Sequence, residues 1–167
     1  MAITRLGANS GKGKVLQVVS TTKTDTFTMS STTFADVTNL SALITPISTS
    51  SKILILYSLM AHTNPNNASF TMRLLRDSTA ISIADSAGSR IQGATIRISG
   101  LNTNNGTGTQ AGSFLDSPNT TSALSYKIQV RTDGAGNPMF VNRGETDTDS
   151  NGFSRGVSTI TVMEIAG

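Results

Sequence analysis

The chain of 167 residues contains no cysteine, no tryptophan and a single histidine. Without cysteine there are no disulfide bonds, thiolate zinc sites, iron–sulfur clusters or cysteine nucleophiles. One histidine excludes any site that needs two imidazoles from one chain. Aromatic residues make up only 5% of the chain, so the ring platforms that glycosidases use to hold sugars are scarce. We therefore expect neither an enzyme nor a bound cofactor or metal.

Long apolar runs are also absent. No window approaches 18 uninterrupted apolar residues, which excludes a transmembrane helix, and the N-terminus lacks the apolar core of a secretory signal. We expect no membrane insertion. Small polar residues are abundant instead, with 22 Ser and 25 Thr.

Charged residues make up 14% of the chain, against about 25% in an average soluble domain. The net charge is +3, and its distribution is uneven. Arg5, Lys12, Lys14 and Lys23 are the only charges before Asp25, whereas the rest of the chain holds nine basic and ten acidic residues. The basic character therefore belongs to the first 24 residues.

We predict that residues 1–13 form a basic docking arm, with Arg5, Lys12 and the adjoining Lys14 contacting an acidic protein surface. A solvated leader is the alternative. A nucleic-acid-binding face would interleave basic and aromatic residues, which this segment does not do, so no nucleic acid is expected as a partner. Residues 14–167 are long enough to bury one core and are predicted to form a single domain.

Strand patterns dominate the domain. No stretch keeps an apolar 3.6-residue period over three turns, so very little helix is expected. About ten short strands separated by turn residues predict an all-β, antiparallel β-sandwich that resembles a jelly roll. The predicted strands cover residues 14–20, 24–29, 36–45, 53–60, 69–76, 80–84, 94–99, 125–131, 138–142 and 156–165.

Two of these strands are informative. In 125–131, Tyr126, Ile128 and Val130 alternate with polar residues and are predicted to face inward. In 53–60, both faces are apolar. This strand is predicted either to be a central strand packed on both sides or to have its second face covered by another subunit.

Two segments, 62–68 and 101–112, are rich in Asn and are predicted to be long loops that decorate a tip or pack against a neighbour. Their side chains are candidate exposed contacts. These candidates are His62, Asn64, Asn66, Asn67, Asn102, Asn104 and Asn105.

Residues 147–152 match the first half of a calcium-binding loop, with oxygen ligands at positions 1, 3 and 5 and a turn glycine. The second half fails, because position 9 is Arg155 and position 12 is Ser158 in place of the bidentate Glu. A polar loop between strands is the favoured interpretation.

A catalytic triad could combine His62 with Ser58 and an aspartate, but 22 serines make chance proximity common. The chain has no nucleophile-elbow pattern, and the strand–turn–helix context of esterases is absent. We expect His62 to be a surface residue.

Several blocks of sequence, taken together and in this order, resemble virion structural proteins of marine tailed bacteriophages, including cyanophages. The resemblance covers about residues 7–167. The blocks are KVLQVVSTTKTDTF, FADVTNL, ITPISTSSKILIL, RLLRDSTAI, FLDSPNTTSALSYKIQV, FVNRGETDTDSNG and GVSTITVMEIAG.

The resemblance implies a non-enzymatic virion component that assembles as a homotrimer. Its expected role is capsid decoration or a head fibre or knob on the particle surface. The arm would attach it to the capsid protein or a neighbouring virion protein. The alternative is a tail-fibre-type receptor-binding module whose Asn-rich loops recognise host surface polysaccharide.

Overall fold

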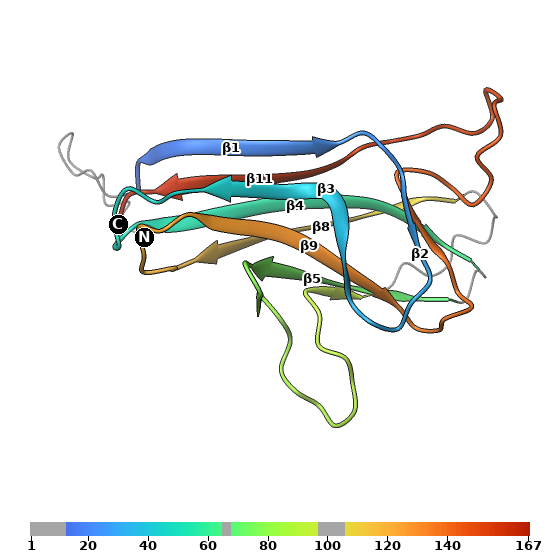
Figure 1. The fold of residues 1–167 in the computed structure, drawn as a ribbon, viewed down its shortest axis with the longest axis horizontal. Coiled ribbons are helices and arrows are strands. Elements are labelled where there is room, and N and C mark those ends of the chain that lie inside the picture. Colours follow the sequence, from blue (N-terminus) through green and yellow to red (C-terminus); the bar gives the residue numbers. More distant parts are fainter. Residues whose placement is uncertain (1–12, 65–67, 97–105) are drawn as a thin grey trace, which may run out of the picture.

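The computed structural model of the protein describes residues 13–64, 68–96 and 106–167. Every regular element in this part of the chain is a β-strand, which confirms the all-β prediction (Figure 1). The strands are β1 (Val15–Lys23), β2 (Phe27–Met29), β3 (Ala35–Ile44), β4 (Lys52–Thr63), β5 (Phe70–Arg76), β6 (Thr79–Ile81), β7 (Thr95–Ile96), β8 (Gly108–Asp116), β9 (Leu124–Thr132), β10 (Met139–Val141) and β11 (Ser158–Ile165).

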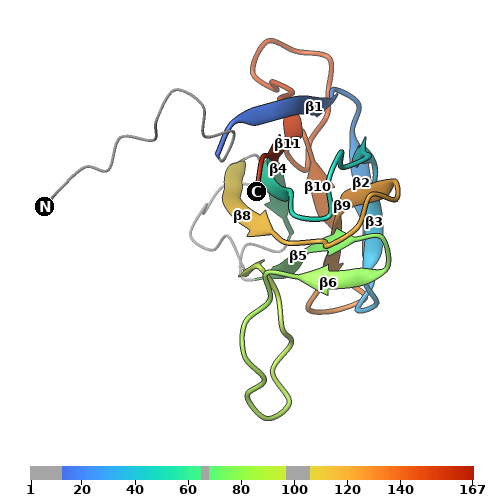
Figure 2. The ribbon, with the colours of Figure 1, turned by 90° about the vertical axis from the view of Figure 1, so that its left-hand side faces the viewer.

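The strands form two antiparallel sheets that pack face to face (Figure 2). The six-stranded sheet has the order β1-β11-β4-β10-β2, with β8 pairing β4. Its partner is a five-stranded sheet of order β3-β9-β5-β6, in which β7 also pairs β5. The chain therefore crosses repeatedly between the layers, as a sandwich requires.

The pairing is nested. β1 pairs with the last strand, β11, then β3 pairs with β9, β4 with β8, and β5 with β7. Such nesting is what a single long hairpin produces when it is rolled into two layers, and it gives the jelly roll its connectivity. The jelly-roll-like sandwich predicted from the strand pattern is confirmed.

The core lies between the layers. Ile53, Ile55 and Leu59 of β4 are completely buried, and so are Tyr126 and its inward-facing neighbours on β9. Each such aliphatic side chain contributes about 1.5–3 kcal/mol by leaving water. The predicted inward face of 125–131 is confirmed, and it comes from the alternation of apolar and polar residues in that strand.

The segment 101–112 was expected to be a loop, but its second half belongs to β8. Gly112 of β8 lies opposite Tyr57 of β4, and a Cβ atom on Gly112 would lie 2.4 Å from the Tyr57 phenolic oxygen. The Tyr57 ring thus occupies the space that a side chain would need. Glycine weakens the local strand signal, which explains why the sequence indicated a loop.

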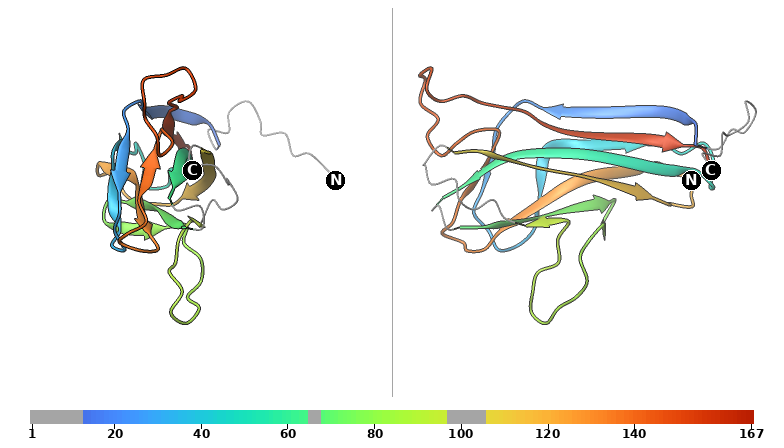
Figure 3. Two further views of the ribbon diagram at one scale, coloured as in Figure 1. Left: turned by 90° about the vertical axis from the view of Figure 1, so that its right-hand side faces the viewer. Right: turned by 180° about the vertical axis from the view of Figure 1, so that it is seen from behind.

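The two ends of the sandwich differ (Figure 3). At one end, the start of β1 lies beside the end of β11, since Val15 pairs with Ile165. The loop between β10 and β11 extends from the opposite end. A further loop, residues 82–93, projects from the five-stranded sheet.

Candidate assembly interface

The outward side of the six-stranded sheet carries an apolar row that crosses four strands. Val18 of β1 pairs with Met163 of β11, Met163 pairs with Leu54 of β4, and Leu54 pairs with Leu115 of β8. Directly paired residues have Cβ atoms about 4.5–5.5 Å apart, so the four side chains are neighbours. Val18 is 55% exposed and Leu115 49%, while Leu54 and Met163 are half-buried.

Two further rows lie beside the apolar row and contain no charged residue. Leu56, 40% exposed, is the large apolar residue of the second row. The hydroxyl groups pair with one another, at 2.8 Å between Ser20 and Thr161 and at 3.2 Å between Ser58 and Thr159. We call the three rows the outer face: Val18, Met163, Leu54 and Leu115; Ser20, Thr161, Leu56 and Ser113; Thr22, Thr159, Ser58 and Ala111.

The outward side of the five-stranded sheet is chemically different. Asp36 of β3 accepts hydrogen bonds from Lys127 Nζ (2.8 Å) and from the Gln129 side chain (2.5 Å). Gln129 accepts two from Arg73, whose guanidinium lies 3.9 Å from the centre of the Phe34 ring. This side carries solvated charges, as expected of a surface that faces water.

The neighbours of Asp36 lower the pKa of its carboxyl group. Its slight burial favours the protonated form, but the hydrogen bonds from Lys127 and Gln129 and the charge of Lys127 outweigh burial and lower the pKa of Asp36. Because one sheet presents a charge network and the three rows of the outer face contain no charged residue, the outer face is the better candidate for contact with another protein.

The borders of the six-stranded sheet also differ. β1 is tied to the neighbouring layer, because Thr21 Oγ1 donates to the Ser41 carbonyl (2.7 Å) and the Gln17 amide donates to the Thr45 carbonyl (2.8 Å). At the other border, β8 pairs only with β4 in the described part of the chain, and from Gly108 to Leu115 it has no charge. A long uncharged border strand is prone to pair with other chains unless something covers it.

The predicted docking arm joins the body at the edge of the outer face. Arg5 and Lys12 lie outside the described residues. Lys14 is exposed, its carbonyl accepts a hydrogen bond from the Ala166 N–H, and the Gly13 N–H donates to the Ala166 carbonyl, both at 2.8 Å. The arm thus begins where β1 and β11 meet.

The expectation that His62 is an exposed loop residue is wrong. His62 lies in β4, pairs with Phe140 of β10 and is 3% exposed. Its ring stacks on Phe140 with centroids 5.9 Å apart, and its Nδ1 lies 2.6 Å from the Gly106 carbonyl oxygen. Pairing with β10 extends β4 beyond the predicted 53–60, and this covers the imidazole.

The other loop candidates are only partly described. Asn64 is half-buried; its backbone N–H donates to the Pro138 carbonyl, and its side-chain amide donates to Glu145. It is therefore engaged within the chain. Asn66, Asn67, Asn102, Asn104 and Asn105 lie outside the described residues.

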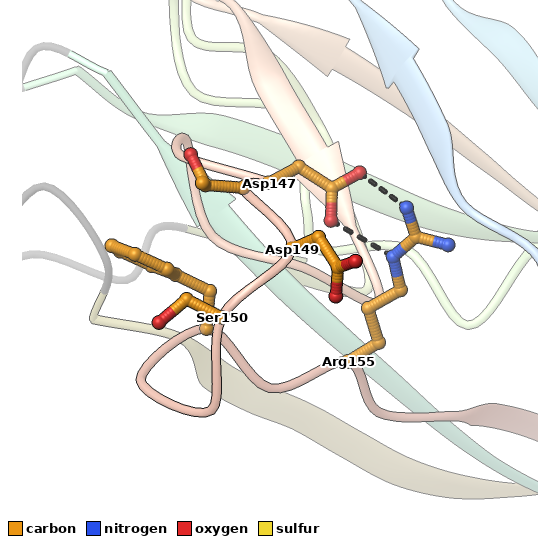
Figure 4. Close-up of a pocket in the computed structure, with 6 residues that line it drawn as sticks. Asp147, Asp149, Ser150 and Arg155 are labelled. Atoms are coloured by element: carbon orange, nitrogen blue, oxygen red, sulfur yellow. Dashed lines mark hydrogen bonds and ion pairs between the residues drawn. The ribbon is translucent and has the colours of Figure 1, made fainter.

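The calcium-like segment holds an ion pair (Figure 4). Both carboxylate oxygens of Asp147 accept hydrogen bonds from Arg155, at 2.8 Å from Nε and 2.6 Å from Nη2. The hydrogen bond from Arg155 lowers the pKa of Asp147. These residues, with Asp149, Ser150 and Phe153, line a shallow pocket of about 310 Å³. Asp147 would be the first ligand of a bound calcium ion, but its carboxylate is already occupied by the Arg155 guanidinium.

Other chemistries find little support in the described residues. Ser58 bonds to Thr159 and His62 to Gly106, so these two side chains do not form a nucleophile–base pair. No group of three or more His, Asp or Glu side chains in the described chain could hold a metal ion. No helix there is long and apolar enough to cross a membrane.

No family model matches the chain, and no curated protein matches its sequence.

Proposed function

We propose that this protein is a non-enzymatic structural component of a bacteriophage virion. It acts as a homotrimeric capsid decoration or head-fibre protein on the particle surface. The single observation that carries the proposal is the outer face, which is uncharged, partly apolar and partly exposed. An exposed apolar patch on a soluble domain typically marks a protein–protein contact.

The fold supports the same proposal by analogy. Jelly rolls are the architecture of many viral capsid domains, although they also occur in lectins and cupins. The resemblance of the sequence blocks to marine phage virion proteins narrows this choice. The basic arm, which leaves the body beside the outer face, would bind an acidic surface of the capsid protein or of a neighbouring virion protein.

The outer face suits contact between identical chains. A face without charges causes no like-charge repulsion when copies meet around a symmetry axis. It also explains the apolar second side of β4, for which the sequence left two alternatives. That side is half-exposed in the single chain, which favours cover by another subunit.

Light scattering of the purified chain tests the assembly. The expected mass is about three times 17.4 kDa. The variant Leu115→Asp places a charge in the apolar row and should yield monomers. The matched control is Leu43→Asp on β3, where an equally large change affects a 68% exposed leucine outside the outer face. A wild-type monomer at micromolar concentration would contradict the proposal.

Particle attachment tests the location. The protein should be found by immunogold labelling on the surface of purified particles of the phage that encodes it. Deleting residues 1–13 should abolish attachment and leave the trimer folded, because every core residue of the described chain lies in or after β1. Absence of the full-length protein from purified particles would refute the virion role.

A second candidate function is recognition of host polysaccharide, and a polar groove favours it. β3 is irregular opposite β9 between Asp36 and Ser41, and the irregularity borders a groove of about 420 Å³ that Asn39 and Lys127 also line. Carboxylate, amide and ammonium groups are suitable partners for sugar hydroxyls. Jelly rolls are also a lectin architecture.

Binding of fluorescent protein to host cells and to their isolated polysaccharide tests this candidate. Lys127→Ala and Asn39→Ala should reduce binding. Arg90→Ala should not, because Arg90 lies in the loop between β6 and β7 and does not line the groove. Absence of binding by the wild-type protein at high concentration would exclude it.

A further inference from the structure

The loop between β6 and β7 projects from the molecule in every view (Figures 1, 2 and 3). Residues 83–91 are all exposed, a run of nine in a chain whose strands are mostly buried on one side. We call residues 82–93 the projecting loop. Connections of this length without regular structure are uncommon in compact domains and usually serve a function.

The base of the projecting loop is firmly held. The Ala94 N–H donates to the Met72 carbonyl at 2.8 Å, and a Cβ on Gly93 would lie 2.4 Å from the Thr71 methyl carbon. Glycine at 93 therefore allows the returning half of the projecting loop to lie directly against β5. The direction in which the loop projects is fixed by this contact.

The two arms of the loop are joined by its own hydrogen bonds. The Gln92 side-chain amide donates to the Ala84 carbonyl at 2.7 Å, and the Arg90 N–H donates to the Ala87 carbonyl at 3.3 Å. Gly88 has a φ of 60°, a left-handed conformation that glycine adopts at no steric cost, and it lies in the turn. The loop is thus shaped in advance, which lowers the entropy cost of binding.

The projecting loop carries apolar side chains that the described part of the chain leaves partly exposed. Ile83 is 40% exposed and Ile91 is 48% exposed. Between the arms lies a hollow of about 380 Å³, which Ala84, Ala87 and Ile91 line together with the charged residues Asp85 and Arg90. The apolar part of this lining can pack against an aliphatic side chain of another surface.

The outer face needs such a partner. Four strands about 4.8 Å apart and three rows of residues give it a width of about 19 Å and a length of about 20 Å, or roughly 400 Å². A stable interface buries about 800 Å² on each partner. The outer face provides roughly half of this area, so a copy that also buries a second surface in the assembly comes closer to it.

We propose that the projecting loop of one copy packs on the outer face of the next copy, with Ile83 and Ile91 against the apolar row. This inference rests on the proposed self-assembly. The two surfaces differ from each other and lie on different sheets, so each contact joins unlike surfaces, and copies can repeat that contact head to tail. Head-to-tail contacts close into rings when the rotation between copies allows it, and a three-membered ring is the proposed trimer.

Hydrogen bonding supports the same pairing. Residues 82–93 belong to no strand, so apart from the hydrogen bonds named above their backbone groups are not paired in a sheet. The Ser and Thr hydroxyls of the outer face can donate to and accept from such backbone groups. Contact with the loop would also cover β8, the uncharged border strand.

Cysteine cross-linking tests the contact, because the natural chain has no cysteine that could interfere. Ile91→Cys is combined in turn with Val18→Cys, Leu56→Cys or Leu115→Cys, and each double variant is mildly oxidised. At least one should form covalent trimers on a non-reducing gel, and each single variant should stay uncross-linked. Covalent dimers from Leu115→Cys alone would indicate a face-to-face dimer and overturn the proposal, as would the absence of cross-links in all three double variants.

A shortened loop provides an independent test. Deleting residues 85–91 joins the arms near their base and leaves every strand intact. The expected result is a three-fold fall in mass, with an unchanged β-sheet circular dichroism spectrum. Ser89→Asp at the exposed turn is the control and should remain trimeric. A shortened variant that stays trimeric would refute this inference and leave the proposed function standing, whereas a monomeric wild-type chain would refute the proposed assembly itself.

Discussion

The phenolic oxygen of Tyr126 donates a 2.7 Å hydrogen bond to Oδ2 of Asp116, and this bond joins β9 of one sheet to β8 of the other. Arg76 of β5 binds the same carboxylate, with Nη1 2.8 Å from both oxygens. Because β8 is held in its own sheet by β4 alone, among the described strands, these bonds fix its end to the opposite layer. They thereby support Leu115, the adjacent residue of the apolar row.

Removing the Tyr126 hydroxyl should weaken this connection. A hydrogen bond to a charged group contributes about 1.5–3 kcal/mol, so Tyr126→Phe should lower the free energy of unfolding by about 2 kcal/mol. Urea denaturation at pH 7 measures the change. Tyr57→Phe is the control and should cost less than 1 kcal/mol. Equal losses from both variants would contradict a specific role for the bond to Asp116.

The same hydrogen bond predicts a loss of stability in alkali. Burial, and then the hydrogen bond to Asp116 and its charge, raise the pKa of Tyr126 above its usual value of 10.0. A group whose pKa is raised by folding stabilises fully below its unfolded pKa, and this contribution falls as the pH rises toward the folded pKa. Wild-type stability should therefore decline above about pH 10, and the decline should be smaller in Tyr126→Phe. A phenolate absorbance that develops near pH 10 without unfolding would contradict this.

The sequence predicts the inner faces of the strands better than their outer faces. The alternation in 125–131 is local and gave the correct inward residues of β9. The apolar row depends on register, because Val18 meets Met163 only through the pairing of β1 with β11. No local pattern connects two residues so far apart along the chain, so the outer face emerges only from the fold.

The errors have local causes. Asn-rich sequence after His62 indicated an exposed loop, but the short strand β10 pairs with the end of β4 and places Phe140 against the imidazole. Likewise, the glycines of β8 indicated a loop, although Gly112 makes room for Tyr57. In both cases a long-range contact outweighed the local preference.

Gly112 is therefore expected to tolerate no side chain. In Gly112→Ala, the new methyl group would lie 2.4 Å from the Tyr57 oxygen, and the ring would have to move within the core. Overpacking of this kind costs about 1–3 kcal/mol. Gly136→Ala is the matched control, because nothing lies within 4 Å of a Cβ at that position. Thermal denaturation compares the two, and equal melting temperatures would contradict the proposed close packing.

Calcium should not stabilise the protein, despite the match at residues 147–152. Both oxygens of Asp147 are engaged by Arg155, whereas a calcium loop would need that carboxylate as its first ligand. The melting temperature should be the same in millimolar calcium chloride and in EDTA. A higher melting temperature in calcium chloride than in EDTA, seen in the wild type and lost in Asp147→Asn, would show that the ion displaces the guanidinium.

Glu164 should make the protein sensitive to acid. Its side chain is completely buried; Oε2 accepts a 2.6 Å hydrogen bond from Gln17, and Oε1 accepts one of 2.8 Å from the Ile47 N–H. Burial alone would raise the pKa of Glu164, but the hydrogen bonds to the carboxylate outweigh it and lower the pKa below 4.5.

A lowered pKa stabilises the fold above the unfolded value, and the contribution is lost as the pH falls through the folded value. Glu164→Gln should therefore cost about 2 kcal/mol at pH 7. The difference from wild type should shrink as the pH falls below about 4.5, where the carboxylate of the unfolded chain begins to be protonated, and on toward the lower pKa of the folded protein. Denaturant titrations of both proteins between pH 7 and pH 3 measure this difference. Asp133→Asn is the control for an exposed carboxylate with a lowered pKa. A difference that stays constant with pH would mean that the charge of Glu164 contributes nothing and that its shape alone matters.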